Sequence, residues 1–466
     1  MGSKKNAWLK FDDAKKQEIF HFCEGYKKYI SDCKTERESI KEAISLAEAK
    51  GYRDLKNVIS TGESLKAGDK VYYNNMDKSL ALFLIGSESI ESGMRIIGSH
   101  VDSPRLDLKP NPLYEDSELS LMETHYYGGV KKYQWVTIPL ALHGVVVKKD
   151  GTKIDVVVGE EETDPVVMVS DLLVHLASEQ QQKKATEVIA GEDLNILVGS
   201  MPLEGEEKEA VKANILKLLK EKYDFEEEDF MSAEIEIVPA GKARDLGLDR
   251  SMVAGYGHDD RICAYTSLLA LLETESVKKT SVVLLVDKEE VGSIGATGMQ
   301  SRFFENAVAE LMDRVGEYSE LKLRRALANS KMLSSDVTAA FDPNYAGAYE
   351  KKNSAFFGKG LAFAKYTGAR GKSGCNDANA EFVAWLRNVM DESDVSYQMA
   401  ELGKVDQGGG GTIAYILAEY GMEVIDCGVA LQNMHAPWEV ASKVDIYETM
   451  RGYKAFLIAE DRKSVV

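Results

Sequence analysis

Long apolar runs and closely spaced cysteines are both missing from this sequence. No apolar stretch approaches the roughly 18–20 residues that a membrane-spanning helix needs, and the first residues, MGSKKNAWLKFDDAKK, lack the apolar core of a signal peptide. The five cysteines form neither a CxxC pair nor a disulfide framework. We therefore expect a cytoplasmic protein that works in a reducing compartment and does not contact membranes.

Positive charge is also scarce. The 57 Lys and Arg residues are outnumbered by 76 Asp and Glu residues, which gives a formal net charge of -19. Because phosphate binding needs a basic face, this balance excludes nucleic acid as a partner. A solvated surface is a sufficient explanation for the acidic charge.

The composition is that of an ordinary globular protein, with 44% hydrophobic and 29% charged residues. A chain of 466 residues exceeds one ordinary core, so we expect at least two domains. The sequence has no internal repeat and no low-complexity linker that would mark the boundary between them.

The first hundred residues combine helices with buried strands. Residues 11–52 predict two amphipathic helices, the second begun by the capping-box pattern Thr35-x-x-Glu38 and ended at Gly51. Two short apolar runs follow, and they predict strands of a central sheet. These runs are LALFLIG at 80–86 and MRIIGSH at 94–100.

The middle of the chain has a different character. The stretch WVTIPLALHGVVVKKDGTKIDVVV predicts strands joined by the turn at 148–151, and a charged helical stretch follows at 206–223. This change of pattern predicts an inserted β-rich domain over 105–240.

Helix and buried strand alternate again after residue 240. The predicted helices lie at 262–273, from Arg302, at 376–390, after the glycines at 408–411, and from Asp445. The predicted strands lie at 280–286, 331–336, 396–400 and 423–428. The expected fold class is therefore α/β, a split α/β catalytic domain (1–104 and 241–466) with a mainly parallel central sheet, interrupted by the inserted domain.

The stretch DKEEVGSIGATG, 287–298, places two adjacent carboxylates, Glu289 and Glu290, directly after a buried strand. Like charges repel, and removing them from water is costly unless a cation or a proton compensates. A solvated loop tip is the alternative interpretation. The apolar strand that leads into the pair favours a buried site with a positive group nearby.

Other candidate strand ends also carry a histidine or a carboxylate. Ligands gather beyond the carboxyl ends of the strands in such a sheet. Taken singly, each of these residues also fits a structural role, as a satisfied histidine or as an acidic residue in the first turn of a helix. The candidates are His100, Asp259, Glu289 with Glu290, Asp336 and His435.

Together these residues predict a metal site. Two histidines and three carboxylates, one of them bridging, suit a pair of divalent ions in a co-catalytic arrangement. Zinc is the expected metal, and manganese or cobalt also suit an oxygen-rich site. In His100-Val-Asp102 the carboxylate is placed to hold one ring nitrogen while the other faces the metal. One glutamate of the pair can ligate an ion while its neighbour acts as general base.

Five segments in this order resemble the aspartyl aminopeptidases, a family of dizinc metallopeptidases. They span nearly the whole chain: SHVDSPRLDLKP, GHDDR, DKEEVGS, SSDVTAAFDPNY and NMHAPWE. The resemblance implies that one ion is held by His100, Asp259 and Asp336. It implies that Asp259 bridges to a second ion, which Glu290 and His435 hold.

The resemblance also assigns the remaining roles. Glu289 would be the general base, and Asp102 would orient His100. The inserted domain of such a protein drives assembly, usually into a dodecamer, and a histidine from a neighbouring subunit completes the site. His175, in SDLLVHLASE, is the candidate here, although a helical position on an apolar stripe also suits a core histidine.

Substrate selection is expected to involve a lysine that pairs with an acidic substrate side chain. Lys365 is the candidate implied by the resemblance, and Lys359 and Arg370 lie close to it in the sequence. The segment GARGKSGCN, 368–376, departs from the family pattern, as does the DDR at 259–261. The preference for N-terminal Asp or Glu is therefore an open expectation.

The expected function is a metal-dependent aminopeptidase, a hydrolase that releases N-terminal residues from peptides with a water activated by two metal ions. A carboxypeptidase or an N-deacylase on the same dizinc site is the enzymatic alternative, because fold and metals do not fix which end of the substrate is held. A non-catalytic scaffold protein that retains the fold is the third interpretation.

Overall fold

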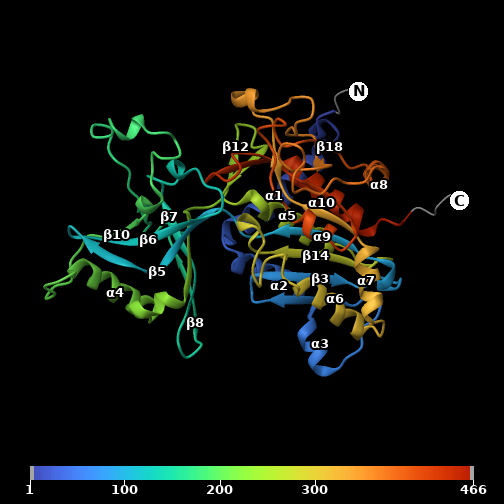
Figure 1. Cartoon of the computed structure of the whole chain (residues 1–466), viewed down its shortest axis with the longest axis horizontal. Helices are drawn as coiled ribbons and strands as arrows, with labels where there is room; N and C mark the ends of the chain where they lie inside the picture. The colour runs from blue at the N-terminus through green and yellow to red at the C-terminus, as the bar shows by residue number, and fades with distance from the viewer. Residues whose placement is uncertain (1–4, 462–466) are drawn as a thin grey trace. The chain divides into compact units, whose positions relative to one another are not determined.

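The computed structural model describes residues 5–461 (Figure 1). Its internal contacts divide the chain into two compact units. The first holds residues 5–102, 244–434 and 439–461, and the second holds residues 103–243 and 435–438. Among the described residues, no helix combines the length and the apolar character needed to cross a membrane.

A nine-stranded sheet forms the centre of the first unit, and five of its eight strand pairings are parallel. The central strands β14, β4, β15 and β19 run parallel in that order. The strands, from one edge to the other, are β1 (Arg53–Asp54), β2 (Lys70–Asn75), β3 (Ser79–Leu84), β14 (Ser281–Val286), β4 (Arg95–His100), β15 (Lys331–Ser335), β19 (Glu423–Gly428), β17 (Leu361–Ala364) and β18 (Tyr397–Met399).

Helices cover both faces of this sheet (Figure 1). Successive side chains of a strand point to opposite faces. In β3, Leu80 and Leu82 belong to one buried cluster, while Ala81 and Phe83 belong to the other. The first cluster includes residues of α1 (Asp13–Asp32), α2 (Glu36–Glu48), α5 (His258–Leu272), α8 (Ala380–Glu392) and α10 (Lys443–Ile458). The second includes residues of α3 (Leu55–Thr61), α6 (Phe303–Arg314), α7 (Glu320–Ala328) and α9 (Ala414–Ala418). The predicted α/β class is confirmed.

The first unit also contains a smaller sheet of five short strands. Their order is β12 (Arg244–Leu246), β13 (Met252–Gly255), β21 (Glu439–Ser442), β20 (Ala430–Gln432) and β16 (Thr338–Ala339). This sheet matters for the site because β13 leads into α5 and β21 leads directly into α10.

The second unit is built on a seven-stranded sheet whose pairings are all antiparallel. The strands are β5 (Arg105–Asp116), β6 (Leu119–Tyr127), β7 (Leu140–Val147), β8 (Lys153–Val158), β9 (Met168–Val169), β10 (Ile196–Gly199) and β11 (Ala233–Pro239), and the helix is α4 (Ala210–Tyr223). The boundaries expected from the sequence, 105 and 240, stay predictions.

Local signals in the sequence account for several element ends. The capping box at the start of α2 is confirmed, since the Glu38 N–H donates to Thr35 Oγ1 (3.2 Å) and the Thr35 N–H donates to Glu38 Oε2 (3.0 Å). The helix expected from residue 262 lies within α5, which starts at His258 and is kinked at Asp259 and Asp260, two residues with non-helical backbone.

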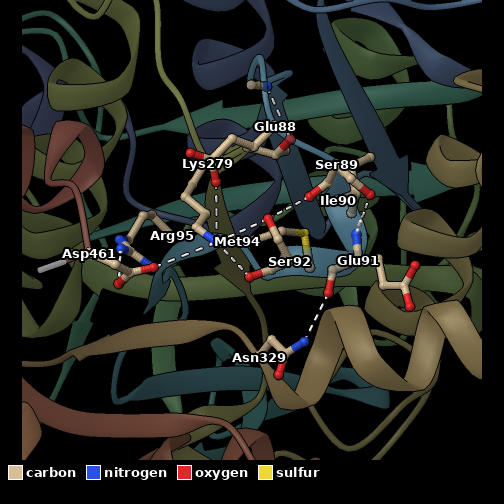
Figure 2. Close-up of polar contacts among 12 residues, drawn as sticks. Glu88, Ser89, Ile90, Glu91, Ser92, Met94, Arg95, Lys279, Asn329 and Asp461 are labelled. Carbon is tan, nitrogen blue, oxygen red and sulfur yellow. Dashed lines mark hydrogen bonds and ion pairs between the residues drawn. The ribbon is translucent and has the colours of Figure 1, made fainter. Parts of the chain in front are cut away.

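Polar side chains gather at the amino ends of β4 and β14 (Figure 2). Arg95, the first residue of β4, is fully buried, and its Nη2 donates to Asp461 Oδ1 (2.7 Å). Lys279 donates to the backbone carbonyl of Ser92 (2.6 Å). The guanidinium of Arg95 also lies 5.0 Å from the ring centroid of Trp385. The contact between Arg95 and Asp461 holds the segment after α10 against the sheet.

We expect Asp461→Ala to destabilise the protein by about 1–3 kcal/mol, because it leaves the buried Arg95 charge without its carboxylate. Arg95→Met replaces the charged side chain with an apolar one, so it should lower the stability less than Asp461→Ala does. The shift in the midpoint of urea unfolding measures both. Equal losses in the two variants would contradict the idea that the unpaired buried charge is the costly element.

Candidate metal centre

The candidate residues meet at one edge of the central sheet. His100 is the last residue of β4, Asp336 directly follows β15, and Glu289 lies three residues after the end of β14. Because these three strands are parallel neighbours, their carboxyl ends lie together. The sheet therefore assembles side chains that are distant in the sequence.

His100 is the centre of this cluster, and only 2% of its surface is exposed. Three carboxylate oxygens surround its Nε2: Asp259 Oδ1 at 3.2 Å, Asp336 Oδ1 at 3.8 Å and Glu289 Oε2 at 3.9 Å. An imidazole nitrogen and several carboxylate oxygens in a closed space form a donor set that suits zinc.

The other nitrogen of His100 fixes the ring. Nδ1 lies 2.9 Å from the backbone carbonyl of Asp102 and 3.4 Å from Asp102 Oδ1. A carbonyl oxygen only accepts hydrogen bonds, so Nδ1 carries a proton and Nε2 is the ring nitrogen that faces the carboxylates of the cluster. Asp102 therefore lies beside Nδ1, and the shorter of its two contacts uses the backbone carbonyl and not the carboxylate expected from the sequence.

Asp102 has a further task that its sequence position does not reveal. Its buried carboxylate accepts two backbone hydrogen bonds, from the N–H of Glu289 to Oδ1 (3.1 Å) and from the N–H of Glu290 to Oδ2 (3.2 Å). The glutamates belong to the 3-10 helix η7 (Glu289–Val291), which follows Lys288 at φ +70°. One residue therefore contacts the histidine most closely through its backbone carbonyl and the glutamate pair through its carboxylate.

Asp259 and Asp260 lie at the start of α5, after Gly257 at φ +72°, and the peptide bond between them is cis. Asp260 is fully buried, and neither of its carboxylate oxygens has a hydrogen-bond partner among residues 5–461. Ligand atoms of Asp260, His100 and Asp336 all lie within 4.8 Å of one another. Asp260 was not among the ligands expected from the sequence, and the structure brings it into the cluster.

Burial controls the protonation of this cluster. It raises the pKa of Glu289 to about 8, and the charges of Asp336 and Asp102 add to that effect while His100 opposes it. Burial likewise raises the pKa values of Asp260 and Asp336. Carboxylates held this way are costly without compensating positive charge, so the donor set fits divalent cations.

A second group of possible ligand atoms comes from His100, Glu289 and Glu290, again within 4.8 Å of one another. His435 is assigned by its contacts to the second unit, where its Nδ1 lies 2.9 Å from the backbone carbonyl of Gly129. That contact assigns the proton of His435 to Nδ1. The role of His435 as a metal ligand stays a prediction.

The two residues expected to contact substrate have different surroundings from those anticipated. His175 is exposed and lies in a run of turns, so the expected helical position is wrong. Lys365 directly follows β17, and its Nζ lies 3.5 Å from Asp377 Oδ1. Lys372 lies closer to the same carboxylate, at 2.8 Å. Lys365 is therefore paired within the chain.

A histidine enclosed by carboxylates at the carboxyl ends of parallel strands, with a glutamate pair held beside it, defines a metal-dependent hydrolase. Comparison with known families narrows this class. The family described as Aminopeptidase I zinc metalloprotease (M18) matches residues 29–457. The chain belongs to this M18 family of zinc metalloaminopeptidases.

Relatives of high similarity support the assignment along the whole chain. A probable M18 family aminopeptidase 1 of Clostridium acetobutylicum is 67% identical over 454 residues, which cover 97% of this chain and 98% of the relative. The crystal structure of aminopeptidase I from the same organism has a TM-score of 0.92 and 66% identity, covering 98% of this chain and 99% of that one. An M18 aminopeptidase structure from Thermotoga maritima has a TM-score of 0.94 and 45% identity over the same shares. Among the alternatives drawn from the sequence, the aminopeptidase is confirmed.

Replacing Asp102 tests the role of its carboxylate. Asp102→Ala removes both acceptors for the glutamate N–H groups, so we expect metal affinity to fall about 10- to 100-fold and kcat to fall at least as much. Asp102→Asn keeps one oxygen acceptor and should lose less. Metal content after dialysis, together with kcat at saturating metal, measures these effects. Full metal retention and full turnover in Asp102→Ala would show that the carboxylate does not position the site.

Proposed function

We propose that this aminopeptidase releases N-terminal residues through two divalent ions. Zinc is the metal of the family, and manganese or cobalt are the proposed substitutes. The ions would be held by His100, Asp259, Asp336, Glu290 and His435. The observation that carries the proposal is the buried ring of three carboxylate oxygens within 3.9 Å of His100 Nε2.

When bound, two such ions polarise the scissile carbonyl and acidify the attacking water. The residues of the chain then have separate tasks. His100, held through Nδ1 by Asp102, presents Nε2 in one fixed direction. Asp259, at the start of α5, places Oδ1 3.2 Å from His100 Nε2, which supports the proposal that its carboxylate would be shared by the two ions.

Glu289 is the proposed general base. It takes a proton from the water at a carboxylate oxygen and later gives it to the leaving amine. The burial that raises its pKa to about 8 favours the protonated form that the second transfer needs. Positive charge nearby favours the carboxylate that the first transfer needs. The two influences together bring the pKa into the range where both transfers are feasible.

Assembly is the second part of the proposal. We propose that residues 1–104 and 241–466 form the catalytic domain, that 105–240 form the inserted domain, and that the protein assembles in the cytoplasm into a dodecamer. A structure of Saccharomyces cerevisiae mApe1 with this fold, 20% identical with a TM-score of 0.76, is a dodecamer. The exposed apolar residues Leu173, Val174 and Leu176 flank His175 and suit contact with another subunit. His175 would complete the site of that subunit.

Glu289→Gln tests the mechanism. Because glutamine cannot accept the proton, we expect kcat for an aminoacyl-anilide to fall about 10²- to 10⁴-fold while both ions remain bound. Glu320→Gln on α7, an exposed glutamate paired with Arg324, is the matched control and should keep full activity. A chelator should abolish the activity of the wild-type protein, and zinc should restore it. Undiminished kcat in metal-loaded Glu289→Gln would refute the assignment of the base.

Substrate preference depends on the charge near Lys365. We propose that Lys365 pairs with an acidic substrate side chain, in competition with Asp377. Asp377→Asn should therefore raise the ratio of kcat/KM for aspartyl-anilide over leucyl-anilide about 1.4- to fivefold, since exposed ion pairs contribute about 0.2–1 kcal/mol. Lys365→Met should lower the same ratio. If neither variant changes the ratio, acidic recognition by Lys365 is wrong while the dizinc proposal is unaffected.

A further inference from the structure

A buried glutamate outside the predicted ligand set lies beside the start of α5. Glu439 is the first residue of β21, and only 1% of its surface is exposed. β21 pairs with β13 in antiparallel register, with Glu439 opposite Gly255. From Gly255 the chain passes through Gly257, at φ +72°, into α5. The small sheet therefore brings Glu439 next to the backbone that carries Asp259.

Glu439 makes a direct contact there. The backbone N–H of Asp259 donates to Glu439 Oε2 at 3.1 Å. The first N–H groups of a helix have no acceptor within the helix, and Asp259 has non-helical backbone angles, φ −79° and ψ 105°. A carboxylate from another strand supplies the acceptor.

The residue before Asp259 is also held from outside the helix. The ring of His258 is fully buried, and the hydroxyl of Tyr26 on α1 lies 2.5 Å from its Nδ1. Burial lowers the pKa of His258 to about 3, so the ring is neutral. Tyr26 thus holds the side chain of His258, and Glu439 holds the backbone of the next residue, Asp259.

We propose that Glu439 is a positioning residue for the metal site. By holding the N–H of Asp259, it fixes the direction in which the Asp259 carboxylate leaves the backbone, 3.2 Å from His100 Nε2. This inference rests on the proposed function, which gives Asp259 the bridging role. A carboxylate shared by two ions must satisfy both at once, so a small rotation of its backbone weakens both contacts.

The test compares variants that remove or keep the acceptor. Glu439→Met and Glu439→Ala remove it, and Met nearly preserves the volume. In both we expect affinity for zinc to fall about 10- to 100-fold, kcat to fall with little change in KM, and the absorption spectrum of the Co²⁺-loaded protein to change. Glu439→Gln keeps an oxygen that accepts the N–H and should retain most of the zinc affinity and the wild-type spectrum.

Asp445 on α10 provides a matched control, since it is equally buried and accepts hydrogen bonds from the N–H groups of Gly358 and Gly360, each 2.7 Å. Asp445→Ala should lose stability but keep zinc affinity and the Co²⁺ spectrum. Wild-type affinity and spectrum in Glu439→Met would overturn the inference, and so would equal losses in Glu439→Gln and Glu439→Met. Asp259→Asn separates the two proposals: unchanged zinc stoichiometry in that variant would instead remove Asp259 from the proposed function.

Discussion

The burial of several carboxylates around one histidine is the constraint on which this structure depends. Asp259, Asp260 and Asp336 surround His100 in a space that water scarcely reaches, and burial raises the pKa values of the carboxyl groups for which a shift is resolved. Such an arrangement is costly unless positive charge or protons compensate. A zinc enzyme resolves the cost by binding its ions, so the instability of the cluster without cations and its affinity for them have the same physical origin.

Two further carboxylates position the cluster without belonging to the proposed ligand set. Asp102 accepts the N–H groups of both glutamates, and Glu439 accepts the N–H of Asp259. In each case a buried side chain holds the backbone of a residue that faces the site. Backbone contacts of this kind restrict the direction of the attached side chain more than a contact between two flexible side chains would. The backbone that carries the glutamate pair and Asp259 is therefore held in place, in addition to the side chains of the site.

Much of the fold and of the candidate metal site could be predicted from the sequence. The apolar runs that form β4, β14 and β15 are continuous, and the polar residue that follows each run falls at the same edge because the strands are parallel. Asp102 accepts hydrogen bonds from the backbone of the two glutamates, and Glu439 accepts one from the backbone of Asp259. These contacts could not be predicted, because a backbone N–H is the same donor in residues of different types and gives no signal in the sequence. The short strands β17 and β21 carry too few residues for a periodic signal. The helical interpretation of His175 failed because an apolar stripe also occurs in a segment of turns.

The precision of the site finally depends on strand register. β4 and β14 pair in parallel from Arg95 opposite Ser281 to His100 opposite Val286. That register brings His100 to the point where β14 turns toward Glu289. A slip of one residue would reverse every side chain of β4 between the two faces of the sheet, moving His100 away from Asp259. Buried apolar residues on both faces, Ile96 on one and Ile97 on the other, oppose such a slip. The packing of the two cores therefore fixes the position of the metal site.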